Sequence, residues 1–467
     1  MRFNSMEFVY FLPAVLVLYQ ILPAAWRRIL LLLASYFFYS FHTPWYGLLL
    51  LATTLIDWYS ALRIDQSREA NSKRVWLLVS IATNIGTLCA FKYAALLYNT
   101  FGIVSSGISG TTWNVWEGLI IPAGLSFYTF QSLGYTIDVY RGMRAERNII
   151  QFGLFVSFFP QLVAGPIERY KTLGTQLHKW PRITTENIVA GMQPFLWGFF
   201  KKLVVADRLA EFVNPVFADP YNFSAGTLFI VAFMFMIQVY CDFSGYTDIA
   251  TGVAKWLGKD LVVNWRRPFF SKSLHEFWQR NHISMTSWFR DYVYIPLGGN
   301  RGGRFKHFRA IFLTFLISGL WHGAGWNFAI WGALHGFVSI IEIVMRDKIK
   351  VRFLGSIYLL TFHALSLIAF RSSDFSGLTE YYSQLFTGSW NWSKLYSELR
   401  TLNDLFPLLL TLLGVLLFVV YEYCEERQVL QRIITHPTAA LTLQIFITVL
   451  IFVLGNFNTT EFIYFHF

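Results

Sequence analysis

The chain has 467 residues, of which 55% are hydrophobic, 19% aromatic and only 14% charged, and its mean hydropathy is +0.44. Soluble globular domains carry about a quarter charged residues, so this composition excludes an ordinary soluble protein. Apolar runs of about 17 to 25 residues recur from end to end, which is typical of a polytopic helical membrane protein.

The predicted membrane segments occupy most of the chain, in the order 6–22, 28–42, 45–62, 75–98, 116–138, 149–166, 188–206, 224–242, 308–324, 326–345, 353–370, 405–420 and 438–455. The first follows a single basic residue and has no small-residue cleavage site, so we expect a retained span and not a signal peptide. Some of the shorter segments are expected to be half-helices or re-entrant. We therefore predict an all-α polytopic membrane protein with about 11–13 membrane segments, folded as a single transmembrane domain over residues 1–467.

Basic residues gather in the connections that are expected on the cytoplasmic side. The largest cluster covers residues 255–309, with eleven Lys and Arg against three acids, and it supplies +8 of the net charge of +11. The positive-inside rule accounts for such a segment, and the same cations are suited to hold a phosphorylated ligand at the cytoplasmic mouth. Counting segments onward from this side places the tail, residues 456–467, outside the cytoplasm. The weakest step in that count is the connection at 421–437, with three acids against two basic residues.

Part of the basic segment is amphipathic. The stretch SKSLHEFWQRNHISMTSWFRDYVYIP, residues 271–296, alternates aromatic and aliphatic residues with charged ones. This pattern predicts a helix that lies at the membrane interface or dips into a cavity lined by protein.

Several apolar segments are interrupted. Pro122, Pro160, Gly165 and Pro166 predict broken helices whose backbone polar groups face a cavity and not lipid. Polar residues inside the segments point the same way, because they cost free energy in hydrocarbon; they are Gln131, Gln161, Gln238, Asp242, Ser244, Asp248 and Asn327. For any one of these residues, the alternative explanation is a polar contact that joins two helices and has only a structural role. Broken helices and buried polar residues also occur in secondary transporters, so a transporter or channel is a second hypothesis.

The stretch SGLWHGAGWNFAIWGALHG, residues 318–336, places His322 inside an apolar segment. The glycines around it allow a backbone or a ligand to approach closely. A neutral imidazole in a low-dielectric cavity can act as a general base near neutral pH, while a packing role is the alternative. His335 is thirteen residues further on, nearly on the opposite side of a continuous helix, so we expect it to be a packing residue.

We expect no metal site. His275 and His282 are seven residues apart and share one helix face, but no third ligand with metal spacing accompanies them. The three cysteines, Cys89, Cys241 and Cys424, lie far apart without metal or redox spacing.

Five stretches carry a resemblance to a known family: SFYTFQSLGYTIDVYRG (126–142), FFPQLVAGPIERY (158–170), QVYCDFSGYTDIATG (238–252), FWQRNHISMTSWFRDYVYIPLGGNRGG (277–303) and SGLWHGAGWNFAIWGALHG (318–336). With these motifs the chain resembles the membrane-bound O-acyltransferases, in particular the bacterial branch that contains alginate O-acetylation proteins. The resemblance extends over nearly the whole chain. It implies a helical bundle with a through-membrane tunnel, in which acyl-coenzyme A enters from the cytoplasm and the acceptor from the opposite face.

The resemblance also assigns residue roles. His322 matches the catalytic histidine of the family, and His282 matches a second polar position that many members fill with Asn, Asp or His. Asn281 stands where relatives often carry Trp. The expected donor is acetyl-coenzyme A, with no permanently bound cofactor. Its phosphates are expected to meet basic residues of the 255–309 segment, for which the candidates are Arg266, Arg267, Lys272, Arg280, Arg301 and Arg304.

The chain ends in FIYFHF, an F-x-Y-x-x-F pattern around Tyr464. This is similar to the C-terminal motif of the small partner peptide in teichoic acid D-alanylation, where a tyrosine is thought to carry the acyl group. The nine residues from Gly455 to Tyr464 can span about 30 Å when extended, whereas half the hydrocarbon core is about 15 Å. Tyr464 could therefore reach His322, which could take its proton. Interfacial anchoring of terminal aromatics is the alternative.

Together these observations predict an O-acetyltransferase of the bacterial inner membrane that moves acetyl outward. A periplasmic serine-esterase-like partner of the SGNH type is expected to pass acetyl to an exopolysaccharide or peptidoglycan, because this chain has no folded periplasmic domain. No nucleic-acid partner is expected. Within the acyltransferase class, the alternative is direct transfer to the partner's serine without Tyr464. An enzyme that acylates a protein is a third hypothesis, beside the O-acetyltransferase and the transporter.

Overall fold

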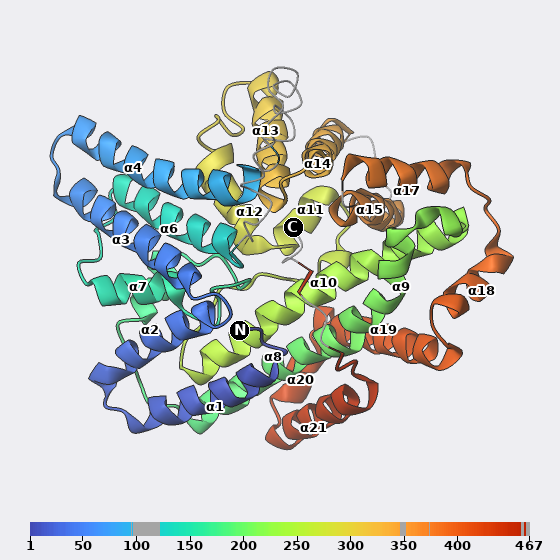
Figure 1. The fold of residues 1–467 in the computed structure, drawn as a ribbon, viewed down its shortest axis with the longest axis horizontal. Coiled ribbons are helices and arrows are strands. Elements are labelled where there is room, and N and C mark those ends of the chain that lie inside the picture. The colour runs from blue at the N-terminus through green and yellow to red at the C-terminus, as the bar shows by residue number, and fades with distance from the viewer. Residues whose placement is uncertain (95, 97–121, 346–351, 373, 459–461, 464–467) are drawn as a thin grey trace, which may run out of the picture. The chain divides into compact units, whose positions relative to one another are not determined.

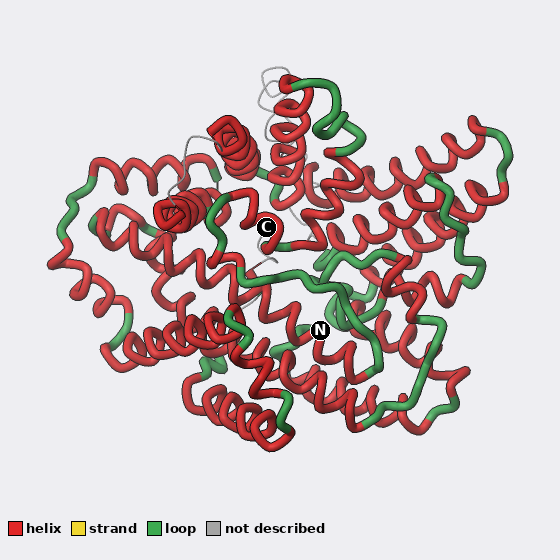
Figure 2. The backbone as a smooth tube through the Cα atoms, turned by 180° about the vertical axis from the view of Figure 1, so that it is seen from behind, coloured by secondary structure: helices red, strands yellow, loops and turns green. Residues whose placement is uncertain are grey.

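A computed structural model of the chain describes residues 1–94, 96, 122–345, 352–372, 374–458 and 462–463. Throughout these ranges the regular structure is helical, without strands, and Figure 2 shows the helices in red and the connecting loops in green. Seven of the described helices are long and apolar enough to cross a membrane. The predicted all-α polytopic class is therefore confirmed. The other predicted segments that lie in described ranges are also helical at least in part, but they are shorter or less apolar.

The chain divides into two compact units. The first comprises Met1–Gly191 and Ala250–Val262, and the second Met192–Ile249 and Val263–Phe467. The single transmembrane domain predicted from the sequence stays a prediction.

The first unit contains α1 (Met6–Ile21), α2 (Ala24–Ser40), α3 (Trp45–Gln66), α4 (Ala70–Leu88) with the π-helical turn η1 (Cys89–Tyr93), α6 (Leu125–Tyr140), α7 (Ile149–Ser157) and η2 (Tyr170–Gly174). Helices α3, α4 and α6 pack against one another (Figure 1). A buried carboxylate joins all three, because Asp57 accepts hydrogen bonds from Ser80 Oγ at 2.6 Å, from Asn84 Nδ2 at 2.9 Å and from Ser132 Oγ. A carboxylate at this depth needs such donors to offset its lost hydration.

One predicted membrane segment of the first unit is half helix and half loop. The sequence predicts a segment over 149–166, interrupted by prolines, and α7 ends at Ser157. The chain then continues without regular helix, because prolines cannot donate backbone hydrogen bonds. Amide side chains replace some of the lost helical bonds: Gln161 Nε2 donates to the Phe155 carbonyl at 3.2 Å, and Gln131 Oε1 accepts from the backbone N–H of Glu168 at 3.3 Å. The predicted broken helix is confirmed.

The second unit holds most of the remaining helices. They are α8 (Thr185–Phe199), η3 (Phe200–Ala206), α9 (Asp207–Ala218), η4 (Pro220–Asn222), α10 (Ala225–Trp256), η5 (Pro268–Phe270), α11 (Leu274–Arg280), α12 (Ile283–Phe289), η6 (Arg290–Tyr294), α13 (Arg304–His322), α14 (Trp326–Met345), α15 (Arg352–Ser366), α16 (Ile368–Arg371), α17 (Phe375–Thr387), α18 (Trp392–Leu402), α19 (Leu405–Glu426), α20 (Val429–Ile434) and α21 (Pro437–Leu454). Helices α8 and α10 begin in one unit and end in the other. The predicted amphipathic stretch 271–296 is helical, but it forms two short helices, α11 and α12, with a break at residues 281–282.

Helices α13 and α14 pack tightly against one another, with residues late in α13 meeting residues early in α14. A Cβ on Gly319 would lie 2.3 Å from the carbonyl oxygen of Phe328, and one on Gly332 would lie 2.4 Å from that of Phe315. These separations are too short for any side chain, so both glycines are needed for the helices to approach this closely.

This packing makes a direct prediction. Gly332→Ala should destabilise the protein by about 1–3 kcal/mol, because the added methyl group meets backbone and not a mobile side chain. Thermal unfolding of the detergent-solubilised protein should show a lower midpoint. The matched control is Gly86→Ala on α4, where a Cβ meets nothing within 4 Å and the change should be neutral or stabilising by up to about 1 kcal/mol. Equal midpoints for the two variants would contradict the packing argument.

Candidate functional site

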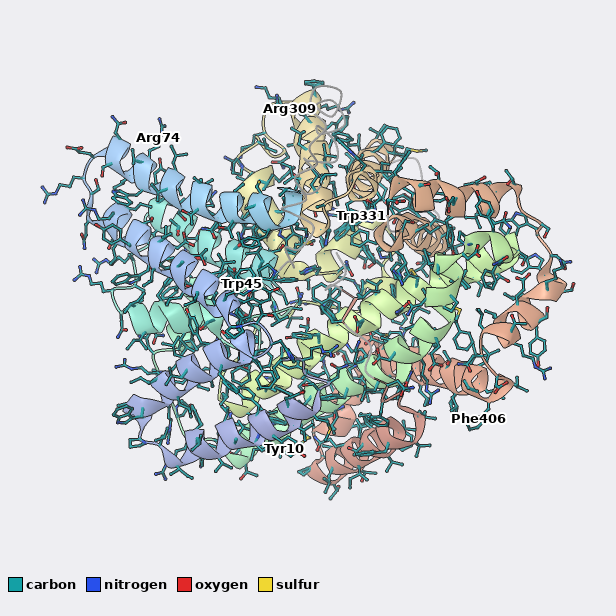
Figure 3. The ribbon with its side chains drawn as sticks, viewed as in Figure 1. Tyr10, Trp45, Arg74, Arg309, Trp331 and Phe406 are labelled. Carbon is teal, nitrogen blue, oxygen red and sulfur yellow. The ribbon has the colours of Figure 1, made fainter. Side chains whose placement is uncertain are left out.

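His322 is the last residue of α13, and a short glycine-containing turn separates it from α14. A Cβ on Gly323 would lie 2.1 Å from the Phe328 ring, so only glycine fits beside the histidine. The imidazole is 4% exposed. Its ring centroid lies 5.3 Å from that of Trp331, labelled in Figure 3, and 5.0 Å from that of Phe370. His322 is therefore held in an aromatic enclosure made by α13, α14 and α16.

His282 occupies the break between α11 and α12, with a left-handed φ of 47°. Asn264 holds this backbone in place, because its carbonyl accepts from the Ile283 N–H at 2.9 Å and its Oδ1 accepts from Ser284 N at 3.0 Å and Ser284 Oγ at 2.9 Å. The same Oδ1 lies 3.4 Å from His282 Nδ1. Burial lowers the pKa of His282 to about 3, so its ring is neutral at physiological pH.

The two predicted histidines line one small cavity of about 50 Å³. Its walls come from α10, η5, α11, α12, α13, α14, α15 and α16 and from the loop before η5; among the lining residues are Met236, Phe243, Trp265, Trp278, Met285, Trp331, His363 and Phe370. Because a cavity needs about 10–15 Å³ of accessible volume to hold one water molecule, this one has room for a group of a few heavy atoms. The structure therefore brings His282 and His322, which are forty positions apart, to one confined and mostly aromatic site.

His363 also lines this cavity, and the sequence reasoning did not single it out. It lies on α15, is 7% exposed, and its ring centroid is 4.4 Å from that of Phe277. Its Nδ1 has no hydrogen-bond partner among the described residues. The only signal in the sequence is a lone histidine in an apolar segment, which by itself favours no role. Within the described residues, no three His, Cys, Asp or Glu side chains are grouped so as to hold a metal ion.

The structure changes the reasoning about His335. A continuous helix would place His322 and His335 on nearly opposite sides, but the chain breaks between α13 and α14, so the two belong to separate helices. His335 is fully buried, its Nε2 lies 3.0 Å from Ser366 Oγ, and its ring packs 4.3 Å from that of Trp331. These contacts fit the packing role that was expected for it.

A second cavity, of about 900 Å³, lies beside the histidine cavity in the same unit. This volume is in the range of pockets that hold cofactor-sized ligands. Trp278 and Met285 line both cavities, so these two side chains stand between them. The polar part of the larger cavity's lining includes Lys272, His275, Arg290, Asn300 and His307, together with one carboxylate, Glu342.

The six basic residues nominated from the sequence are placed differently from one another. Lys272 lines the large cavity. Arg267 is paired with Glu425 at 2.9 Å and with Glu426 at 2.7 Å, and Arg280 is paired with Glu426 at 2.9 Å and Glu276 at 2.8 Å. The other three, Arg266, Arg301 and Arg304, are exposed and are not among the residues lining either cavity. Contact of any of the six with coenzyme A stays a prediction.

Arg290 lines the large cavity although the sequence reasoning did not nominate it. It follows α12 in the amphipathic stretch, and its Nε donates to Asp291 at 2.8 Å. The charge pattern of residues 255–309 could not distinguish it from the other cations, because that pattern carries no information on which side chains share a cavity.

Within the C-terminal tail the structure describes residues 456–458 and 462–463, and Phe462 and Ile463 are buried. The ring of Phe462 lies 5.7 Å from that of Phe243 and 5.3 Å from that of Tyr246. Phe243 in turn lies 4.8 Å from His282. The third predicted site residue, Tyr464, lies outside the described residues, and its role stays a prediction.

Comparison with known proteins gives consistent results. The model of the membrane-bound O-acyltransferase family matches residues 146–370. The Azotobacter vinelandii protein named probable alginate O-acetylase is 36% identical over 439 residues, which is 91% of this chain and 86% of that protein. A peptidoglycan O-acetyltransferase of Helicobacter pylori is 34% identical over 73% of this chain and 70% of its own length. A teichoic acid D-alanyltransferase of Streptococcus thermophilus is 28% identical over 53% of this chain and 61% of its own length.

Measurements of thermal stability can test whether Asn264 holds the backbone around His282 in place. Asn264→Ala removes the acceptor shared by the Ser284 N–H and hydroxyl, and leaving buried donors unsatisfied costs about 1–3 kcal/mol. We expect a lower midpoint of thermal unfolding and faster modification of His282 by diethylpyrocarbonate, followed by peptide mass spectrometry. Ser287→Ala, which removes one hydroxyl donor in the same segment, is the control and should change both much less. Unchanged His282 reactivity in Asn264→Ala would refute this support.

Proposed function

Because this chain belongs to the membrane-bound O-acyltransferase family, we propose that it is an O-acetyltransferase of the bacterial inner membrane that uses cytoplasmic acetyl-coenzyme A. It is a multi-pass membrane protein and an acyltransferase. The observation that carries the proposal is the meeting of His322 and His282 in one small cavity, which shares Trp278 and Met285 with a larger cavity whose lining includes the cations Lys272 and Arg290.

The two cavities suit the two parts of the donor. Coenzyme A is an extended molecule with several phosphate charges, and the larger cavity offers both the volume and, in Lys272 and Arg290, the cations to receive it. The acetyl thioester would pass between Trp278 and Met285 into the histidine cavity, whose volume of about 50 Å³ suits a short acyl group. An acceptor arriving from the opposite side of the membrane would complete the tunnel that the resemblance implies.

His322 is the proposed general base. Its imidazole takes the proton of the acceptor hydroxyl while the hydroxyl oxygen attacks the thioester carbonyl carbon. The carbon–sulfur bond then breaks, and the imidazolium returns the proton to the departing coenzyme A thiolate. The aromatic walls around His322 exclude water, which limits hydrolysis of the thioester.

His282 is proposed to position or polarise the thioester. A neutral imidazole can donate one hydrogen bond to the carbonyl oxygen, where negative charge develops during attack. The neutrality of His282 and its fixed backbone, held by Asn264, support this role.

Tyr464 is the proposed acceptor and carrier. A phenol has a pKa of about 10, so it needs a base such as His322 to become nucleophilic. The resulting aryl ester keeps a high transfer potential and can pass acetyl onward. The buried positions of Phe462 and Ile463, which precede Tyr464 in the chain, support a tail that approaches the histidine cavity.

Outside the membrane, a serine-esterase-like partner of the SGNH type would take acetyl from Tyr464 and give it to a polymer. The relatives named for alginate and peptidoglycan O-acetylation make an exopolysaccharide or peptidoglycan the proposed final acceptor. Direct transfer to the partner's serine is the alternative. Transport without acyl chemistry has less support, since the family is one of acyltransferases.

The role of His322 predicts a large catalytic effect. In proteoliposomes given radiolabelled acetyl-coenzyme A, His322→Gln should lower the rate of acetyl transfer about 10²–10⁴-fold, the range that a general base supplies. His335→Gln, which alters a buried histidine outside both cavities, is the control and should keep most of the activity. Comparable loss in both variants, with both folded by size-exclusion chromatography, would contradict the assignment of the base.

The carrier hypothesis predicts a covalent intermediate. After incubation with acetyl-coenzyme A, the intact mass of the C-terminal peptide should increase by one acetyl group. Tyr464→Phe should abolish the increase because the hydroxyl is gone, and His322→Gln should suppress it. If Tyr464→Phe leaves polymer acetylation in the complete system at the wild-type level, direct transfer to the partner is correct instead.

A further inference from the structure

A buried carboxylate next to the histidine cavity divides its two oxygens between two donors. Asp242 lies on α10 and is 3% exposed. Its Oδ1 lies 2.6 Å from Nζ of Lys202, and its Oδ2 accepts the backbone N–H of Ile463 at 2.7 Å. One oxygen is thus used by an ion pair within the bundle, and the other holds the C-terminal tail.

The ion pair fixes the orientation of the carboxylate. Lys202 also pairs with Asp207 at 2.9 Å, so its ammonium group is anchored from two directions. Asp242 cannot rotate without breaking a buried ion pair, which is strongly unfavourable at this depth. The second oxygen is therefore presented to the tail in a constant position.

An aromatic contact accompanies the hydrogen bond. Phe462, the residue before Ile463, packs on Phe243 and Tyr246, which are one and four positions after Asp242 on α10. A backbone hydrogen bond beside an apolar anchor is a common way to hold an extended segment. Phe243 itself lines the histidine cavity and contacts His282.

We propose that Asp242 is a positioning residue that docks the C-terminal tail through the backbone N–H of Ile463, and so delivers the next residue, Tyr464, to the histidine cavity. This inference rests on the proposed carrier function of Tyr464. It assigns to Asp242 and Phe462 the binding of the tail and leaves the chemistry to the histidines. The same α10 turn thus serves both the docking site and the cavity wall.

The chain offers a matched control. Asp248, also on α10, pairs with Lys201 at 2.6 Å, and Lys201 is the neighbour of Lys202. No contact between Asp248 and the tail occurs among the described residues. Asp242→Asn and Asp248→Asn therefore each disturb one ion pair with one of two adjacent lysines, but only the first also disturbs the tail.

Asparagine at position 242 keeps the shape and loses one acceptor. The single side-chain oxygen of asparagine can accept from Lys202 Nζ or from the Ile463 N–H. Its NH₂ group then faces the other donor, and two donors cannot form a hydrogen bond. Carboxypeptidase digestion of the full-length protein, followed by intact mass, should trim the tail past Ile463 about tenfold faster in Asp242→Asn than in Asp248→Asn. Equal trimming of the two variants would overturn the docking role.

Function gives a second readout. The initial rate of Tyr464 acetylation should fall about tenfold or more in Asp242→Asn, while the KM for acetyl-coenzyme A stays unchanged because the large cavity is not altered. A general structural defect would change both. Wild-type tails that are protected but never acetylated would refute the carrier function of Tyr464 and leave the docking role standing.

A pair of tail variants avoids any effect on folding of the bundle. Ile463→Pro removes the backbone N–H, whereas Ile463→Ala keeps it and shortens only the side chain. The proposal expects loss of Tyr464 acetylation in the proline variant and near-normal acetylation in the alanine variant. The opposite order, or equal rates, would show that the Asp242 hydrogen bond to the Ile463 N–H does not hold the tail.

Discussion

Two adjacent lysines in the interior of a membrane helix impose the main constraint on the second unit. Lys201 and Lys202 are 2% and 7% exposed, and an unpaired ammonium group there would cost several kcal/mol. Two carboxylates of α10, Asp242 and Asp248, form ion pairs with these lysines. Electrostatic attraction as well as packing therefore holds η3 against α10. Because α10 also supplies walls of the histidine cavity, the ion pairs fix the position of the site along with the fold.

The aromatic enclosure explains how an imidazole can do chemistry at this depth. His322 is surrounded by rings from three helices, and His282 is held beside them by Asn264. Low polarity strengthens any hydrogen bond to charge that develops during reaction. The small volume that remains limits what can react there, while the larger cavity has the space for a bulky donor.

Much of this could be predicted from residue order. The runs and periodicity of apolar residues predicted the positions of most helices. The prolines after α7 predicted the break that the structure contains. The glycines around His322 indicated a place of close approach, and they do make room for Phe328. His363 was missed because a single histidine in an apolar helix has no local signature. The pairing of Arg267 and Arg280 with Glu426 was equally invisible, since these residues are about 150 positions apart and a charge count treats every cation alike.

The sequence by itself determined that this chain is a helical membrane protein of a recognisable family and that His322 was the residue to examine. Those conclusions rest on the composition of the chain, on the periodicity of its apolar residues and on local motifs. None of these depends on how distant parts of the chain pack. Only the tertiary structure decided which cations share a cavity, that a third histidine joins the site, and that Asp242 gives its second oxygen to the tail. Such pairings depend on how helices distant in the chain pack and on which charges are desolvated together, and no local pattern encodes that geometry.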